Sequence, residues 1–317
     1  MPITAPLSRG SALRAEIQPS GGTALAATIG DFELLALAGR GTFAEVWQVR
    51  DRRSGRIRAL KRLRADRSDQ KSARQILENE AEVGRKVASS HLVACCESHL
   101  DAELPYLVLE WLSGRTLESR LSAERLFCRD GLWIARQCAQ GLHALLVAGF
   151  THGDLKPSNI FLCDDGVVKL IDFGFARPDR QSPRELDSAA ERTIGGTPEF
   201  MAPETLVAAE VAGPGRDVYS LGVTLYQMLS GKLPFQGETI ADVLKQQQQA
   251  VPQSLRSLAP HVPRELDELV GRLLSKQPLR RGGGLAWLVQ ELIGLELSYL
   301  AADARMEASE AGVESEE

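Results

Sequence analysis

The spacing of apolar residues changes along this chain of 317 residues. Between Phe32 and Leu63, short apolar runs alternate with turns at Gly39, Gly41 and Ser54-Gly55, a pattern typical of a β-meander. Further along, apolar residues recur at helical spacing, in particular Trp133, Ile134, Cys138, Leu142, Leu145, Val218, Leu221, Leu225 and Leu229. The pattern predicts an α+β fold with a small β-rich lobe, a larger α-helical lobe and a ligand cleft between them.

Composition divides the chain into three parts. Residues 1–29 are rich in Ala, Ser, Gly and Pro, which predicts a flexible leader. Residues 30–293 form the expected folded domain, with the small lobe over 30–110 and the large lobe over 113–293. The acidic residues 294–317 are expected to form a disordered tail.

Composition and charge exclude several classes of protein. A formal net charge of -5 argues against a general nucleic-acid binder, because affinity for phosphate backbones comes mainly from clustered Lys and Arg. No apolar run reaches the roughly 18 to 20 residues that a membrane helix needs, and the N-terminus has no signal-peptide core. The five cysteines form no C-x-x-C pair and are expected to be reduced, buried thiols. We therefore expect a cytoplasmic protein that binds neither nucleic acid nor membrane.

The sequence HGDLKPSNIFL, residues 152–162, contains three side chains that suit phosphoryl transfer. This reaction requires the protein to position metal-bound phosphates, orient the acceptor hydroxyl and neutralise the transferring oxygens. Asp154 can accept the acceptor's proton, Lys156 can neutralise the transferring phosphate, and Asn159 can offer an oxygen to Mg²⁺.

Asp172, in the sequence IDFG, can supply a second oxygen to the same metal. The Asp165-Gly166 turn predicts that residues 167–170 return as a hairpin, which would bring Asn159 and Asp172 side by side. Two metal ligands would then face one pocket.

A glycine turn and a lysine upstream suit the binding of phosphates. The backbone of the turn around Gly41 can approach phosphates, although a G-x-G sequence alone is a weak signal and a plain strand turn is commoner. Lys61 lies on a strand that is expected to run back beneath this turn. An acidic residue on a neighbouring helix should hold this lysine. Glu80 is preferred over Glu78 and Glu82, because it shares a helical face with apolar residues.

In their order and spacing, these residues resemble the eukaryotic-type (Hanks-type) serine/threonine protein kinase family. The resemblance covers roughly residues 30–290 and includes D-F-G at 172–174 and A-P-E at 202–204. It implies a bilobal kinase fold, ATP as the phosphate donor, and Mg²⁺, or Mn²⁺ as an alternative, as the metal. The residues implied to hold the nucleotide are Gly39, Gly41, Val46, Ala59, Lys61, Glu80, Leu109, Glu110 and Leu112, and those implied to hold the metal are Asn159 and Asp172.

The resemblance also implies which residues act on the acceptor. Asp154, Lys156 and Thr197 are the implied catalytic residues, and the threonine should hydrogen-bond to the other two, as in the Ser/Thr-specific branch. Protein Ser and Thr hydroxyls are therefore the expected acceptors. Residues 107–112 look like the hinge that binds adenine through backbone groups, with Leu109 at the gatekeeper position.

Further residues match structural positions of the family. Asp217 resembles the buried aspartate that braces the catalytic loop, and Arg281 resembles the arginine that pairs with the A-P-E glutamate, Glu204. His152 is expected to pack near Phe173 and not to act as a base, because Asp154 already fills that role.

Three residues depart from the family pattern. Ala44 replaces the third glycine of the turn, which adds only a methyl group and should be tolerated. Gly84 replaces an apolar side chain of the packed spine between the lobes, so we expect a packing gap, an adjustable helix and a regulatory protein partner. Gly153 replaces the arginine before the catalytic aspartate, which makes the chain a non-RD variant, and its compact architecture is similar to bacterial members.

The missing arginine has a consequence for regulation. In the family, that arginine receives a phosphate on the activation loop, so the loop at 175–199 is expected to order without modification. Alanine at Ser182, Ser188 and Thr193 should then leave most activity intact.

Two other functions fit parts of this pattern. His-Gly-Asp also occurs in aminoglycoside and choline phosphotransferases, but that family generally lacks the Phe-Gly after the metal aspartate and the A-P-E segment. A pseudokinase that acts as a nucleotide-binding scaffold usually loses the lysine, a metal ligand or the catalytic aspartate, and all of these are present here. A Ser/Thr protein kinase is therefore the preferred hypothesis.

Overall fold

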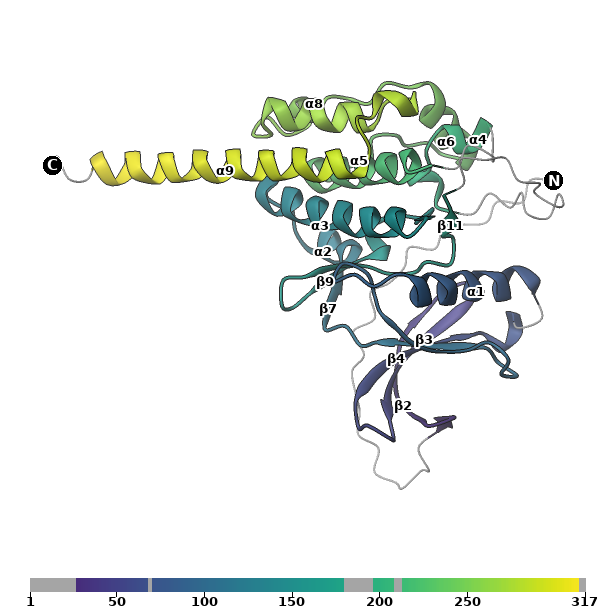
Figure 1. Cartoon of the computed structure of the whole chain (residues 1–317). Coiled ribbons are helices and arrows are strands. Elements are labelled where there is room, and N and C mark those ends of the chain that lie inside the picture. Colours follow the sequence, from purple (N-terminus) through teal and green to yellow (C-terminus); the bar gives the residue numbers. More distant parts are fainter. Residues whose placement is uncertain (1–26, 68–69, 180–195, 208–212, 314–317) are drawn as a thin grey trace.

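The structure, a computed structural model, describes residues 27–67, 70–179, 196–207 and 213–313, with side chains up to residue 301. Figure 1 shows two lobes. The lower lobe contains a twisted sheet and helix α1 (Lys71–Lys86), and the upper lobe is a group of helices. This arrangement confirms the predicted bilobal α+β fold.

The small lobe is built on one six-stranded antiparallel sheet in the order β1-β2-β3-β4-β6-β5. Its strands are β1 (Thr28–Ile29), β2 (Phe32–Arg40), β3 (Ala44–Asp51), β4 (Ile57–Leu63), β5 (Cys95–His99) and β6 (Tyr106–Glu110). Strands β2 to β4 form the predicted meander. Because β1 pairs with the start of β2, the predicted leader is wrong at residues 28–29, and residues 1–26 lie outside the described part.

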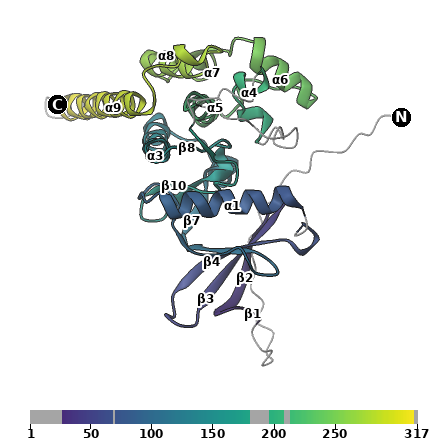
Figure 2. The same cartoon turned by 45° about the vertical axis from the view of Figure 1, so that its right-hand side comes forward.

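The two faces of this sheet belong to different apolar clusters, because successive side chains of a strand point to opposite sides. One face has a small cluster of its own, formed by Phe32, Val49, Leu60, Tyr106 and Val108. The other face, with Ala59 and Leu109, joins Leu77 of α1 and the helices of the large lobe in one main core. Helix α1 lies between the sheet and the large lobe (Figure 2) and therefore links them.

The large lobe consists mainly of helices. They are α2 (Leu117–Ala123), α3 (Cys128–Val147), α4 (Glu204–Val207), α5 (Gly215–Ser230), α6 (Ile240–Gln249), α7 (Leu255–Leu258), α8 (Arg264–Leu273) and α9 (Leu285–Val313). Helix α5 is buried from Val218 to Tyr226, as expected for a helix that is apolar all round. It ends at Gly231, whose φ of 72° is the left-handed conformation that favours glycine.

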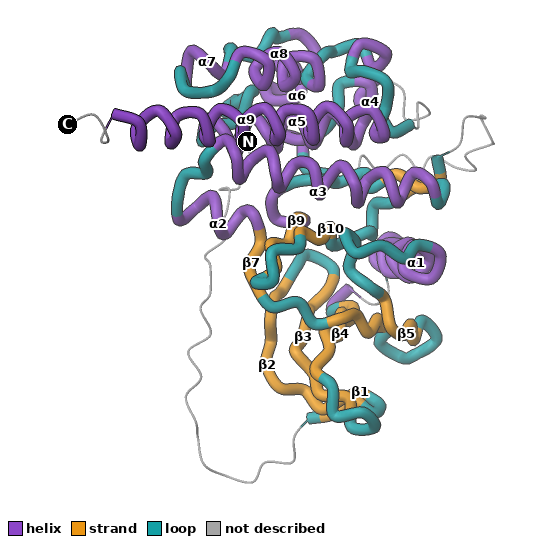
Figure 3. Tube along the Cα trace, turned by 60° about the vertical axis from the view of Figure 1, so that its left-hand side comes forward, coloured by secondary structure: helices purple, strands orange, loops and turns teal. Residues whose placement is uncertain are grey.

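Short elements between the lobes carry the candidate catalytic residues. Figure 3 shows strands β7, β9 and β10 between the sheet and the helices. The bounds of these elements are β7 (Gly114–Thr116), β8 (Phe150–Thr151), β9 (Ile160–Cys163), β10 (Val168–Leu170), β11 (Arg177–Pro178), and the 3₁₀ turns η1 (Ala65–Arg67), η2 (Pro157–Asn159), η4 (Pro198–Phe200) and η5 (Pro278–Arg280). The pairing of β9 with β10 confirms the predicted hairpin.

The predicted disordered tail is wrong for residues 294–313, because these residues continue α9 (Figure 1). Leu295 and Tyr299 pack against the main core, and Glu296 accepts hydrogen bonds from Arg136 of α3 at 2.8 and 2.9 Å. Packing against α3 thus extends the helix into the acidic segment. Within the described residues, no helix is both long and apolar enough to span a membrane.

Candidate active site

Four strands place the predicted nucleotide-binding residues on one face of the sheet. Gly39 on β2 pairs with Val46 on β3, and Val46 pairs with Lys61 on β4. Ala59 lies two residues before Lys61, so its side chain points to the same face, and it pairs with Leu109 on β6. The strand register therefore produces one continuous surface that includes the lysine.

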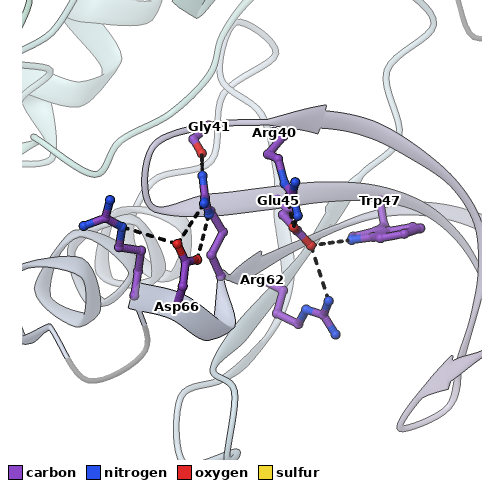
Figure 4. Close-up of polar contacts among 8 residues, drawn as sticks. Arg40, Gly41, Glu45, Trp47, Arg62 and Asp66 are labelled. Atoms are coloured by element: carbon purple, nitrogen blue, oxygen red, sulfur yellow. Dashed lines mark hydrogen bonds and ion pairs between the residues drawn. The ribbon is translucent and has the colours of Figure 1, made fainter.

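The glycine turn between β2 and β3 is held by hydrogen bonds to its backbone (Figure 4). The N–H of Gly41 donates to Ala44 O at 2.8 Å. Gly41 O accepts from Arg64 Nη1 at 3.3 Å, the contact drawn at Gly41 in Figure 4. Arg64 also donates to Asp66 at 2.8 and 2.9 Å. The described contacts thus tie the tip of the turn to the end of β4.

Glu45 ties three strands together on the sheet face opposite Lys61 (Figure 4). Its carboxylate, buried on β3, accepts from Arg40 at 2.6 and 2.9 Å, from Trp47 at 3.3 Å and from Arg62 at 3.4 Å. The hydrogen bonds from Arg40 lower the pKa of this carboxyl. Glu45 is not among the residues predicted from the sequence, although arginines lie in register with it on both neighbouring strands.

Lys61 makes the ion pair that the sequence predicts. Its Nζ lies 2.5 Å from Glu80 Oε2 and 3.1 Å from Asp172 Oδ1. Glu80 is only 2% exposed, whereas Glu78 is exposed and Glu82 pairs with a surface lysine. The choice of Glu80 as the partner is therefore confirmed, and it follows from which side of α1 faces the sheet.

Burial and charge have opposite effects on this cluster. Burial works to lower the pKa of Lys61, but the charges of Asp172 and Glu80 outweigh it and raise the pKa, so the lysine stays charged. Burial raises the pKa of Glu80 to about 6, since the lysine offsets only part of the desolvation. The second oxygen of Glu80, Oε1, is buried and has no hydrogen-bond partner among the described residues.

Asp154 is the centre of a hydrogen-bond network in the catalytic loop. Its Oδ1 accepts from Thr197 N at 2.9 Å and from Thr197 Oγ1 at 3.1 Å. Lys156 Nζ lies 2.8 Å from Asp154 Oδ2 and donates to Thr197 Oγ1 at 2.6 Å. Asn159 Nδ2 donates to Asp154 O at 2.8 Å. The four residues form one site, and the hydrogen bonds expected of the threonine are confirmed.

Asp217 of α5 holds the backbone of this loop through hydrogen bonds, as the resemblance implies. Its carboxylate accepts from the backbone N–H of His152 at 2.7 Å and of Gly153 at 3.0 Å. The His152 ring is buried and packs edge-on against Phe173, with 5.6 Å between ring centroids. The predicted packing role of the histidine is therefore confirmed.

Gly153 has a backbone conformation that favours glycine. Its φ is 79°, and a Cβ at this position would lie 2.4 Å from Phe175 O. Residues 180–195 lie outside the described part, so the predicted independence from loop modification, including Ser182, Ser188 and Thr193, stays a prediction.

Gly153→Ala is expected to lower the free energy of unfolding by more than about 1 kcal/mol, because a side chain is disfavoured at this φ and meets a backbone oxygen. Denaturant titration measures the change. The matched control is Gly294→Ala in α9, where a Cβ meets nothing within 4 Å and stability should rise by about 0.5 to 1 kcal/mol. A Gly153→Ala protein as stable as the wild type would contradict the prediction.

Asn159 and Asp172 lie next to each other and fit a hard divalent cation. Ile171 N donates to Asn159 O at 3.0 Å, which holds the two segments together. Asn159 donates to Asp154 through Nδ2, and Lys61 and the N–H of Gly174 both contact Asp172 through Oδ1. Asn159 Oδ1 and Asp172 Oδ2 are then the oxygens that these side chains can offer to a cation. Oxygen donors of this kind are those that Mg²⁺ prefers.

The connection between the lobes runs through residues 111–113. The Glu110 carboxylate accepts from Lys169 Nζ at 2.7 Å and from Ala94 N at 2.8 Å, so it fastens the end of β6 to β10. Leu112 is half-buried against the main core. The Glu110 side chain is thus engaged within the protein, which leaves backbone groups of this segment for a base.

The predicted packing gap at Gly84 is wrong. A Cβ on this glycine would lie 2.3 Å from Cys95 Cβ, so the side chain of Cys95 on β5 already fills the space. The expectation of a regulatory partner loses its basis with the gap. The cysteines are all free, but only Cys128 and Cys138 are fully buried, and Cys96 is exposed.

Arg281 and Glu204 form the ion pair that the resemblance implies. Arg281 Nη1 lies 2.5 Å from Glu204 Oε1, and Nη2 lies 2.7 Å from Oε2. The arginine is 2% exposed and also donates to Gly215 O at 2.7 Å and Ser275 O at 2.9 Å. This pair fastens the segment after Thr197 to α5 and η5.

Comparison with known proteins places this geometry in a family. The family model described as the protein kinase domain matches residues 32–292. A probable serine/threonine-protein kinase of Streptomyces coelicolor is 33% identical over 78% of this chain and 37% of its own length. The serine/threonine-protein kinase AtPK1/AtPK6 of Arabidopsis thaliana is 33% identical over 81% of this chain and 53% of its own. PknA of Corynebacterium glutamicum, named a serine/threonine-protein kinase, is 31% identical over 79% and 53%.

The chain spans between 37% and 53% of the length of these curated relatives. The matched region contains both lobes and every residue of the candidate site. The chain therefore belongs to the protein kinase family.

Proposed function

We propose that this chain is a serine/threonine protein kinase that transfers the γ-phosphate of ATP directly to a protein hydroxyl, without a phosphoenzyme intermediate. The observation that carries the proposal is the network in which Lys156 and Thr197 both contact the Asp154 carboxylate. Phosphoryl transfer depends mainly on positioning and on charge stabilisation, and this network supplies both.

Each residue of the site has a role in this reaction. Asp154 orients the acceptor hydroxyl and takes its proton, and Lys156 neutralises the transferring phosphate. Lys61, held by Glu80, binds the α and β phosphates. Asn159 and Asp172 would hold Mg²⁺ or Mn²⁺, which when bound neutralises charge on the ATP phosphates. The face with Gly39, Gly41, Val46, Ala59 and Leu109, and the segment with Glu110 and Leu112, would hold the rest of the nucleotide.

The acceptor would lie in a groove that is lined by Lys156 and Thr197. The groove has a volume of about 790 Å³, and its walls include Lys156, Thr197, Glu199, Phe127 and Pro260. Lys156 and Thr197 belong to the catalytic network, so an acceptor that lies in this groove would have its hydroxyl near Asp154.

The acceptor class is tested with labelled ATP and three substrates: a Ser/Thr-containing protein, a matched peptide with tyrosine as its only hydroxyl, and an aminoglycoside. We expect label on Ser or Thr, and a loss of transfer in Thr197→Ala, whose hydroxyl no longer bridges Asp154 and Lys156. Label mainly on the aminoglycoside or on tyrosine would contradict the proposed acceptor.

Transfer is expected to weaken as the pH falls through about 6, because Glu80 then gains a proton and its pairing with Lys61 weakens. The free energy of unfolding depends on pH in the opposite direction. Because folding raises the pKa of Glu80, its contribution to stability is fully present below its ordinary pKa and is lost as the pH rises through about 6. Values of kcat/KM for ATP between pH 5 and 8 should show an acid limb in the wild type that Glu80→Gln lacks. The same limb in both proteins would assign the titration to another group.

A further inference from the structure

Gln247 is the one buried residue in the run Gln246 to Gln249. Its side chain is 0% exposed, whereas Gln248 and Gln249 are exposed. Helix α6 turns Gln247 toward the 3₁₀ turn η4, here called the acceptor platform (Pro198–Phe200).

A chain of hydrogen bonds with a fixed direction passes through Gln247. Lys276 Nζ lies 3.4 Å from the Tyr219 hydroxyl, which in turn donates to Gln247 Oε1. A lysine ammonium has donors only, so the tyrosine must direct its own proton to the glutamine. The amide NH₂ of Gln247 then faces the platform and donates to Glu199 O at 2.6 Å.

Lys276, the first donor in this series of hydrogen bonds, packs against an aromatic ring. Its Nζ lies 3.8 Å from the centroid of the Phe235 ring, and among the described residues it has no carboxylate partner. Tyr219 is fully buried on α5. The orientation of the Gln247 amide is therefore determined by two groups outside the platform.

The platform is directly joined to the catalytic network. Glu199 is two residues beyond Thr197, whose backbone N–H and hydroxyl contact Asp154. On its other side, the platform is held by Ser220 Oγ, which donates to Phe200 O at 2.8 Å. Gln247 and Ser220 thus hold the backbone of the platform from two different helices.

We propose that Gln247, oriented by Tyr219, is a positioning residue that holds the acceptor platform in place for a protein substrate. The inference rests on the proposed function and deepens it, because the platform lines the groove beside Lys156. The nucleotide contacts none of these residues in the proposed site, so the effect should fall on the protein acceptor and not on ATP.

The test compares Gln247→Glu with Gln248→Glu. Glutamate keeps the volume of the buried side chain, and in its ionised form it has no proton to donate to Glu199 O, so the rates are measured at pH 8 or above. The control makes the same change at an exposed position of the same helix. We expect Gln247→Glu to lower kcat/KM for a peptide acceptor by about tenfold, with KM for ATP unchanged, and Gln248→Glu to match the wild type.

A second variant keeps the test decisive if a buried glutamate disturbs folding. Tyr219→Phe removes only the hydroxyl that orients the amide, and it should raise KM for the peptide while leaving KM for ATP unchanged. Wild-type kcat/KM values for the peptide in both variants would overturn the inference, as would equal changes for peptide and ATP. A wild-type protein that phosphorylates no protein would instead overturn the proposed function, and the inference with it.

Discussion

Asp154→Asn is expected to lower the rate of phosphate transfer by about 10²- to 10⁴-fold, the usual contribution of a positioned proton acceptor. Asparagine has the same shape, and its remaining oxygen can still accept from Thr197. It cannot take the proton of the acceptor hydroxyl, and it removes the charge that pairs with Lys156 at 2.8 Å. Single-turnover measurements at saturating ATP separate this loss from changes in nucleotide affinity.

The matched control for this variant is Asp164→Asn, at an exposed position of the hairpin that follows the catalytic loop. It makes the same chemical change outside the network and should leave the rate unchanged. An Asp154→Asn protein that transfers phosphate within a few-fold of the wild-type rate would remove Asp154 from the role of base.

Arg281→Ala is expected to lower the free energy of unfolding by about 3 to 5 kcal/mol, the cost of leaving one member of a buried ion pair without its partner. The substitution would leave the Glu204 carboxylate without the two nitrogens that bind it. The carbonyl oxygens of Gly215 and Ser275 would also lose their hydrogen bonds from Arg281. Urea denaturation measures the change. Because Arg281 and Glu204 act as a pair, Glu204→Gln in the same protein should add less than its own separate cost.

An exposed arginine provides the control for this experiment. Arg264 pairs with Glu268 one helical turn away in α8, and both side chains are largely exposed. Arg264→Ala should leave the free energy of unfolding almost unchanged, because water and salt screen an exposed ion pair. Similar small changes for Arg281→Ala would mean that the buried pair contributes little to the large lobe.

Contacts between motif residues were predictable where local periodicity determines them. Lys61 and Val46 share a sheet face because strand side chains alternate, and Glu80 faces Lys61 because it lies on the apolar side of α1. The hairpin of β9 and β10 followed from its turn residues, and it brought Asn159 next to the segment that carries Asp172. The positions of Thr197, Asp217 and Arg281 came from the family resemblance.

Features that depend on distant packing were not predictable in the same way. The space beside Gly84 is filled by Cys95, a residue on another element whose position the local sequence does not reveal. Gln247 has the same side chain as its three neighbours in the run, and it differs only because it lies on the side of α6 that faces the platform. The acidic composition after residue 293 suggested disorder, but α9 packs Leu295 and Tyr299 against the core.

The most direct test of the account is transfer of labelled γ-phosphate from ATP-Mg²⁺ to a protein substrate by the wild type, Asp154→Asn and Asp172→Asn. We expect label on Ser or Thr with the wild type and almost none with either variant, because one lacks the proton acceptor and the other a metal ligand. A wild-type protein that binds ATP-Mg²⁺ but transfers no label would contradict it and indicate a nucleotide-binding scaffold.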